Sequence, residues 1–141
     1  MTLYSLINEL KEAFTIKEAW EKLYAIYGDR FLKALEAVDL GHVKKYLLTP
    51  SGRFFWVVVG KERDYWVLPG FFCTCDDFYV NVVTRARSKY CYHLLAQALA
   101  EALLKYEVFN VSDEEGEALI AEWRTMVKNH KIHSKKVKRN Y

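Results

Sequence analysis

Three cysteines and one histidine stand close together in the chain and offer the donor atoms of a metal site. They form two close pairs, Cys73 with Cys75 and Cys91 with His93, separated by fifteen residues. Three thiolates and one imidazole suit a tetrahedral Zn²⁺ ion, and four protein ligands leave no open coordination position. The pattern therefore predicts one structural zinc ion. The alternative is that these thiols only fill the core, and no C-x-x-C spacing supports a redox site.

The spacing within each pair determines which backbone can bring its ligands together. In an extended segment, residues two apart point to the same face, so Cys73 and Cys75 can converge there. On a regular helix, Cys91 and His93 would be about 200° apart, so they converge only at a helix N-terminus. The free N–H groups and the helix dipole at that end also favour a thiolate. Three thiolates leave a net negative centre, which nearby basic residues could offset: Arg85, Arg87 and Lys89.

The hydrophobic pattern predicts the elements that must position these ligands. Residues 1–40 predict three helices, the second beginning with a capping box between Thr15 and Glu18 and ending at Gly28, and the third capped by Asp29. Strands are predicted over residues 46–48, 53–59, 64–68 and 78–84, the first two as a hairpin. The fold class is α+β, with N-terminal helices, an antiparallel β-sheet of about three to four strands, a zinc-anchored helix, a C-terminal helix and a basic tail.

The helix predicted from Cys91 to about Tyr106 is apolar on almost every side. Its polar residues beyond the histidine form one narrow stripe of Gln97, Glu101 and Lys105. Such a helix must be covered by neighbours, either the N-terminal helices or a second subunit. A final helix begins at Ser112, with Glu115 completing a capping box, and turns these residues inward: Leu119, Ile120, Trp123 and Met126.

Length and composition indicate one soluble domain. The chain has 141 residues, of which 52% are hydrophobic, and no apolar run long enough to span a membrane. No signal-peptide pattern opens the sequence, so an intracellular protein is predicted, cytoplasmic or, in a eukaryote, nuclear. The predicted organisation is a single zinc-binding domain over residues 1–127, with its metal motif at 73–96, and a basic tail over residues 128–141.

The charge is unevenly distributed between these two parts. Of the 21 basic and 18 acidic residues, six basic ones and no acidic one lie in the tail, which leaves 15 against 18 in the body. A mildly acidic body with a strongly basic end predicts binding to phosphate backbones, while the alternative is a solvated terminus that only aids solubility. The candidate nucleic-acid-binding residues are Arg85, Arg87, Lys89, Lys128, Lys131, Lys135, Lys136, Lys138 and Arg139.

The metal motif resembles that of the SWIM zinc-finger family, C-x-C followed by C-x-H. The alanine three residues after the histidine, Ala96, extends the match to C-x-H-x-x-A, which resembles the SWIM subunit of Shu-type recombination accessory complexes. This resemblance implies a non-enzymatic protein that pairs with a RecA-family ATPase paralogue. It also implies contact with single-stranded or branched DNA, directly or through that partner. Homodimerisation in the absence of the partner remains open.

Two other functional classes compete with this interpretation. One is a stand-alone nucleic-acid-binding zinc-finger protein, a regulator acting on DNA or RNA, for which the basic residues and aromatic residues such as Tyr79, Tyr90 and Tyr92 would provide the contacts. The alternative for these tyrosines is that they pack within the fold. The other is an enzyme. The sequence has no glycine-rich phosphate loop, no Ser-His-Asp arrangement and no H-E-x-x-H motif, so it predicts no catalytic activity.

The small size of Ala96 in the metal motif also has a physical reason, because a larger side chain one turn beyond His93 would crowd the metal site.

Overall fold

The computed structural model describes residues 15–60, 63–69, 72–75 and 90–133, with residues 5, 7–9 and 12 nearer the N-terminus. The strand predicted over residues 78–84 lies outside the described residues. So do Arg85, Arg87, Lys89 and the tail beyond residue 133. No helix in the described part of the chain is both long and apolar enough to cross a membrane.

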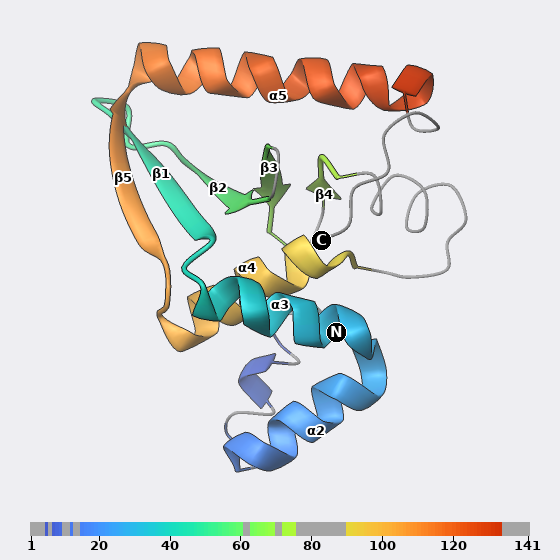
Figure 1. Cartoon of the computed structure of the whole chain (residues 1–141). Coiled ribbons are helices and arrows are strands. Elements are labelled where there is room, and N and C mark those ends of the chain that lie inside the picture. Colours follow the sequence, from blue (N-terminus) through green and yellow to red (C-terminus); the bar gives the residue numbers. More distant parts are fainter. Residues whose placement is uncertain are drawn as a thin grey trace.

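A five-stranded mixed sheet forms the centre of the fold, in the order β4-β3-β2-β1-β5 (Figure 1). Four strands are antiparallel neighbours: β1 (Val43–Thr49), β2 (Phe54–Val59), β3 (Asp64–Leu68) and β4 (Phe72–Cys73). The fifth, β5 (Glu107–Ser112), runs parallel to β1, with Lys44 opposite Glu107 and Thr49 opposite Ser112.

The predicted α+β class is confirmed, but the sheet is not the antiparallel one of three to four strands. The strand at residues 107–112 is missing from the sequence-based prediction, and it makes the sheet mixed. Its pairing partner β1 is distant in sequence, so no hairpin turn between the two strands indicates that they pair. Five of its six residues are exposed, which removes the alternation that usually reveals a half-buried strand.

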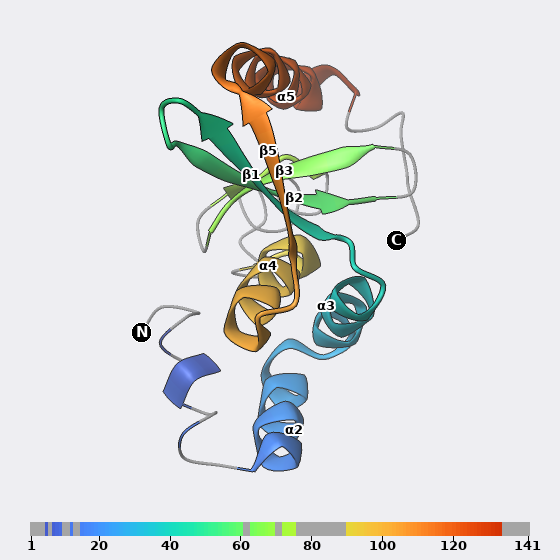
Figure 2. The same ribbon diagram turned by 90° about the vertical axis from the view of Figure 1, so that its left-hand side faces the viewer.

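Helices cover the two faces of the sheet unequally. Figures 1 and 2 show α5 (Asp113–His133) along one face and a group of three on the other, namely α2 (Ile16–Tyr27), α3 (Asp29–Asp39) and α4 (Tyr92–Leu103). The apolar side chains of β2 pack into the cores on both faces of the sheet. Trp56 and Val58 belong to the core beneath α3 and α4, whereas Phe55 and Val57 pack with Trp123 of α5. A strand covered on both faces needs no polar face, which explains why β2 is apolar along its whole length.

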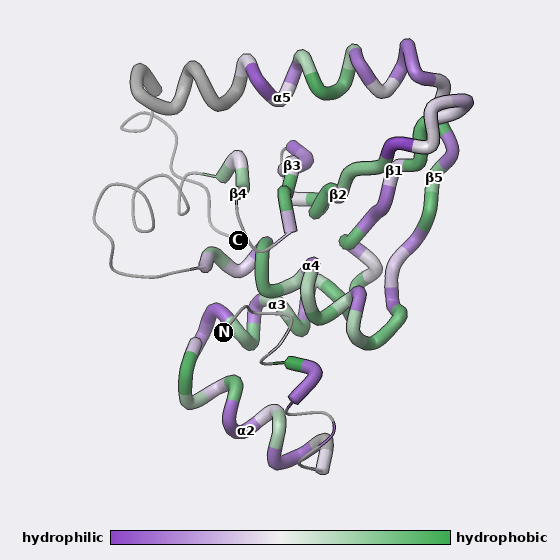
Figure 3. Tube along the Cα trace, turned by 180° about the vertical axis from the view of Figure 1, so that it is seen from behind, coloured by the Kyte–Doolittle hydropathy of each residue, from purple (hydrophilic) through white to green (hydrophobic). Residues whose placement is uncertain are grey.

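The helix α4 is buried by the rest of the same chain. Every residue from His93 to Ala100 is buried, and most of α4 is hydrophobic in Figure 3. The neighbouring α3 contributes Phe31, Ala34, Ala37 and Val38 to the same core. The small alanines on the two helices allow close approach. Of the two coverings left open by the sequence, the N-terminal helices provide this one, so α4 offers no free apolar face to a partner.

Capping residues set the helix boundaries. The backbone N–H of Glu18 donates to Thr15 Oγ1 at 3.2 Å and that of Thr15 donates to Glu18 Oε2 at 3.2 Å, so the predicted capping box is present. Gly28, with φ of +61°, ends α2 and caps α3, so Asp29 is in the first turn and is not the cap. At α5, the N–H of Glu115 donates to Ser112 Oγ at 3.1 Å.

Asp64, the first residue of β3, provides a prediction about stability and pH. Burial and the nearby Glu122 carboxylate raise the pKa of Asp64, against the influence of Lys44. The folded state therefore holds this proton more tightly than the unfolded state, so its stability falls as pH rises through that window. We expect Asp64→Asn to stabilise the fold by a few tenths of a kcal/mol at about pH 7.5, because the group is partly solvated, with the gain shrinking as the pH falls towards the ordinary aspartate pKa of about 3.9.

Urea unfolding of the zinc-loaded protein at several pH values measures this effect. Asp39→Asn is the matched control, since Asp39 is an exposed carboxylate on α3. A gain from Asp64→Asn that stays constant over the same pH range would contradict the explanation, because an uncharged contact effect would not titrate.

Candidate metal centre

Two separate parts of the fold supply the candidate ligands. Cys73 ends β4 at the sheet edge, and Cys75 follows it in a bend. Cys91 is the N-cap residue of α4, in an extended conformation, and His93 lies in the first turn of the helix. This is the arrangement that the C-x-H spacing requires, because a cap residue can turn towards a side chain that regular helical geometry would place far from it.

The four side chains converge on one point. The ligand atoms of Cys73, Cys75, Cys91 and His93 all lie within 4.8 Å of one another, and all four residues are buried. A tetrahedral zinc ion with bonds of about 2.3 Å to sulfur needs ligand atoms about 3.8 Å apart, so the cluster must contract only slightly. Donor types, number and spacing therefore fit one zinc ion. Bound there, zinc would cross-link the sheet edge to the start of α4.

Hydrogen bonds around Thr74 hold the first pair of ligands against the sheet. The N–H of Thr74 donates to the carbonyl of Trp66 at 3.2 Å, and the N–H of Trp66 donates to Thr74 Oγ1 at 3.0 Å. Arg63 Nη2 reaches the Thr74 carbonyl at 3.5 Å. The residue between the two cysteines thus ties them to β3, a positioning role that sequence reasoning missed, although a hydroxyl residue inside C-x-C was the available signal.

The cysteines differ in acidity although all are buried. Burial raises the pKa values of Cys73 and Cys75 well above the ordinary range. Burial acts on Cys91 too, but the two neighbouring thiols and the charge of the adjacent His93 imidazole favour its thiolate and bring the pKa of Cys91 well below its usual value. Without metal, the cluster favours one thiolate at the helix N-terminus. Zinc must displace the remaining thiol protons, which couples its binding to pH.

Aromatic rings enclose the histidine side of the centre. The ring centroid of Tyr65 lies 4.4 Å from that of His93, and the centroid of Tyr92 lies 3.9 Å away. The Arg63 guanidinium sits 5.0 Å from the Tyr65 ring centroid. Tyr65 is buried, and burial raises the pKa of Tyr92. A centre with four protein ligands suits a structural ion, because these ligands complete the tetrahedral coordination of zinc.

Of the other predicted site residues, the structure places Ala96, Lys128 and Lys131, and the rest lie outside the described residues. Ala96 is fully buried in the core cluster that also contains Cys75 and Cys91, which agrees with the need for a small residue there. Lys128 and Lys131 lie within α5. The remaining basic candidates fall outside the described residues, so their predicted contacts stay predictions. Among the described residues, the cation near the centre is Arg63, which sequence reasoning did not select.

Comparison with known proteins identifies the family. No protein-family model and no solved structure matches the chain. A zinc finger SWIM domain-containing protein 7 homolog from Dictyostelium discoideum is 29% identical over 123 residues, which cover 85% of this chain and 79% of the relative. An uncharacterized protein from Archaeoglobus fulgidus is 34% identical over 107 residues, which cover 76% of this chain and 85% of the relative. Zinc finger SWIM domain-containing protein 7 from Danio rerio is 32% identical over 114 residues, which cover 79% of this chain and 77% of the relative. With its Cys-Cys-Cys-His cluster, the chain therefore belongs to the SWIM zinc-finger family of zinc finger SWIM domain-containing protein 7.

Proposed function

We propose that this protein is a non-enzymatic accessory factor of homologous recombination and DNA repair. In this proposal it binds a RecA-family ATPase paralogue and assists a recombinase on single-stranded DNA. The metal motif supports this assignment, since the string from Cys73 to Ala96 resembles that of the SWIM subunit of Shu-type complexes.

The observation that carries the proposal is the closure of the metal centre. All four ligand residues are at most 2% exposed, so a zinc ion there would hold surfaces in place and would not meet a substrate. It would fix the position of α4 against β3 and β4, and through them the surfaces that a partner could recognise. A protein that acts by presenting such surfaces is a binding module.

Co-expression with the RecA-family paralogues of the source genome tests the proposal. We expect one of them to co-purify in a stable stoichiometric complex with zinc-loaded protein and to be lost when the zinc ligands are replaced. The proposal is wrong if the zinc-loaded protein forms no complex with any of those paralogues. Retained binding to nucleic acid under those conditions would favour the stand-alone nucleic-acid-binding function.

The basic end of the chain leads to a separate prediction about DNA. The helix α5 continues through Lys128 and Lys131 to His133, so the predicted tail begins on a helix. Truncation after Val127 would shorten that helix. Replacing its six Lys and Arg residues with Gln instead removes charge and leaves the backbone intact. If all six contact phosphates of single-stranded DNA, the logarithmic salt slope should fall by about 4.

Fluorescence anisotropy of a labelled oligonucleotide at several salt concentrations gives this slope. Lys17→Gln is the control, because Lys17 is an exposed lysine on α2 at the opposite end of the chain. An unchanged slope in the sixfold variant would remove the tail from any DNA-binding role.

A further inference from the structure

The outer edge of the sheet at β5 is exposed, and within the described part of the chain it lacks the features that usually protect such an edge. β5 is the last strand in the sheet order, and Figure 2 shows it in front of the other strands with neither α4 nor α5 crossing it. Its central residues from Val108 to Val111 contain no charge and no proline. Proteins commonly block an edge strand with lysine, proline, a bulge or an overlying element, because its free peptide groups can pair with another strand.

Both faces of this strand carry exposed apolar side chains. Val108 is 50% exposed and lies beside Lys45 of β1, while Phe109 is 39% exposed and lies beside Tyr46. The rings of Phe109 and Tyr46 have centroids 5.5 Å apart, so Phe109 belongs to the face that α5 covers further along. Val108 lies on the opposite face, since successive residues alternate. An added strand could therefore bury apolar surface on both faces.

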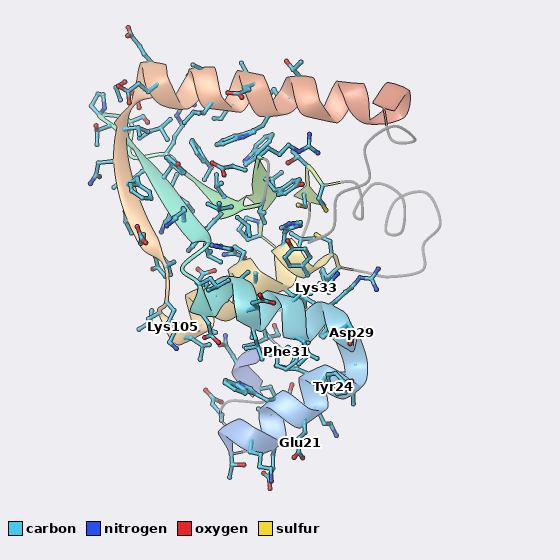
Figure 4. All side chains as sticks on the ribbon, in the orientation of Figure 1. Glu21, Tyr24, Asp29, Phe31, Lys33 and Lys105 are labelled. Carbon is cyan, nitrogen blue, oxygen red and sulfur yellow. The ribbon has the colours of Figure 1, made fainter. Side chains whose placement is uncertain are left out.

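The Glu107 charge at the start of β5 is already compensated within the chain. Glu107 forms an ion pair with Lys44 at 2.9 Å, and the Lys44 Nζ also lies 5.5 Å from the Phe109 ring centroid. Figure 4 places Lys105 in the connection before the strand. With no unpaired charge along its centre, this edge selects no oppositely charged partner, and an identical uncharged strand would suit it.

Two copies of β5 can pair about a two-fold axis normal to the sheet. Such an axis keeps each face of the sheet continuous, so the strands pair antiparallel about a residue at the centre. With Asn110 at the centre, Phe109 of each copy faces Val111 of the other, an aromatic and β-branched pair of the kind that stabilises sheets. Val108 then faces Ser112. Glu107 then lies opposite Asp113, where β5 has ended and α5 has begun, whereas pairing about Phe109 would set the Glu107 carboxylate against Val111 within the strand itself.

We propose that β5 is a self-association surface, through which two copies of this chain join their sheets into one continuous antiparallel-paired sheet. Its occupant is a second copy, and the surface is distinct from the metal centre. The proposal does not depend on a RecA-family partner, so its failure would leave the proposed recombination function standing.

Sedimentation equilibrium of the zinc-loaded protein with Val108→Lys and Phe109→Lys tests the surface. Wild type should be dimeric at about 100 µM, and each variant should raise the dissociation constant at least about tenfold, because two new lysines would face the joined edge. Leu32→Lys is the matched control, since Leu32 is 49% exposed on α3, away from the sheet. A monomeric wild type, or variants that dimerise as wild type does, would overturn the proposal.

A cross-link separates this pairing from any other dimer. In an antiparallel pair, directly opposite Cα atoms lie about 4.5–5.5 Å apart, which a disulfide can span. Asn110→Cys should give a covalent dimer on mild oxidation, and Lys105→Cys should not. A dimer that forms no cross-link at Asn110 or at Phe109→Cys is not paired through β5. Binding of a RecA-family ATPase to β5 by a protein that is monomeric alone would also contradict self-association.

Discussion

Replacing Cys91 with serine should abolish the cooperative fold as well as the zinc site. Cys91 is fully buried, caps α4 and joins the sheet-derived ligands to His93. Structural zinc ions contribute about 10–16 kcal/mol to small domains, which matches or exceeds a typical folding free energy of about 5–15 kcal/mol. We therefore expect zinc content near zero, loss of near-UV circular dichroism and no sharp thermal transition at neutral pH.

Variants at His93 distinguish loss of the metal from loss of packing. His93→Cys keeps four protein ligands and should retain zinc with a reduced melting temperature, while His93→Ala should lose both zinc and the transition. Acid should act in the same direction as chelation, because protons compete with zinc for the thiolates and the imidazole, so stability falls as pH falls. A chelated protein that contains no zinc and keeps its full melting temperature would show that the centre is not structural.

Gly116→Ala should destabilise the protein by about 1–3 kcal/mol, although alanine is the better helix former by about 1 kcal/mol. A Cβ atom at Gly116 would lie 2.5 Å from Leu48 Cγ and 3.0 Å from Leu48 Cδ1. Leu48 is fully buried in β1, in the cluster that contains Trp123. It cannot rotate away without disturbing that cluster, so α5 itself would have to move off the sheet.

A double-mutant cycle tests this explanation. Leu48→Ala alone removes buried side-chain volume and should cost about 2–5 kcal/mol, but it also makes room for the new methyl group. The combined variant should therefore be more stable than the sum of the two single changes predicts, by at least about 0.5 kcal/mol. Glu114→Ala is the control, because Glu114 is exposed in the same turn. Simple additivity would place the cause of the destabilisation elsewhere.

The metal ligands could be predicted because their signal is local. Two close pairs of soft donors restrict the backbone to an extended segment and a helix start, and the structure brings the four side chains together in that way. The supports of the centre were not predictable to the same extent. Thr74 and Arg63 act through hydrogen bonds whose partners depend on how β3 and β4 pair, which no residue spacing specifies.

Fold prediction succeeded for helices with caps and failed where pairing is distant. The capping box at Thr15 and the Ser112 hydroxyl, which accepts from the N–H of Glu115, mark helix starts through contacts within four residues. By contrast, β5 is defined by a strand far away in sequence, and β1 begins at Val43, earlier than its hairpin pattern indicates. Whether α4 is covered by its own chain or by another was likewise undecidable from periodicity, since an apolar surface does not identify its cover.

The parallel pairing of β5 with β1 has a consequence for synthesis on the ribosome. Lys44 pairs with Glu107, so 63 positions separate the partners (107 minus 44). During translation, the hairpin of β1 and β2 emerges long before β5, and β1 is an open edge in the nascent chain throughout that interval. Closure of so long a loop is slow compared with hairpin formation. A ribosome stalled before Ser112 would therefore display an unpaired β1, which makes this interval the one in which chaperones have most to protect.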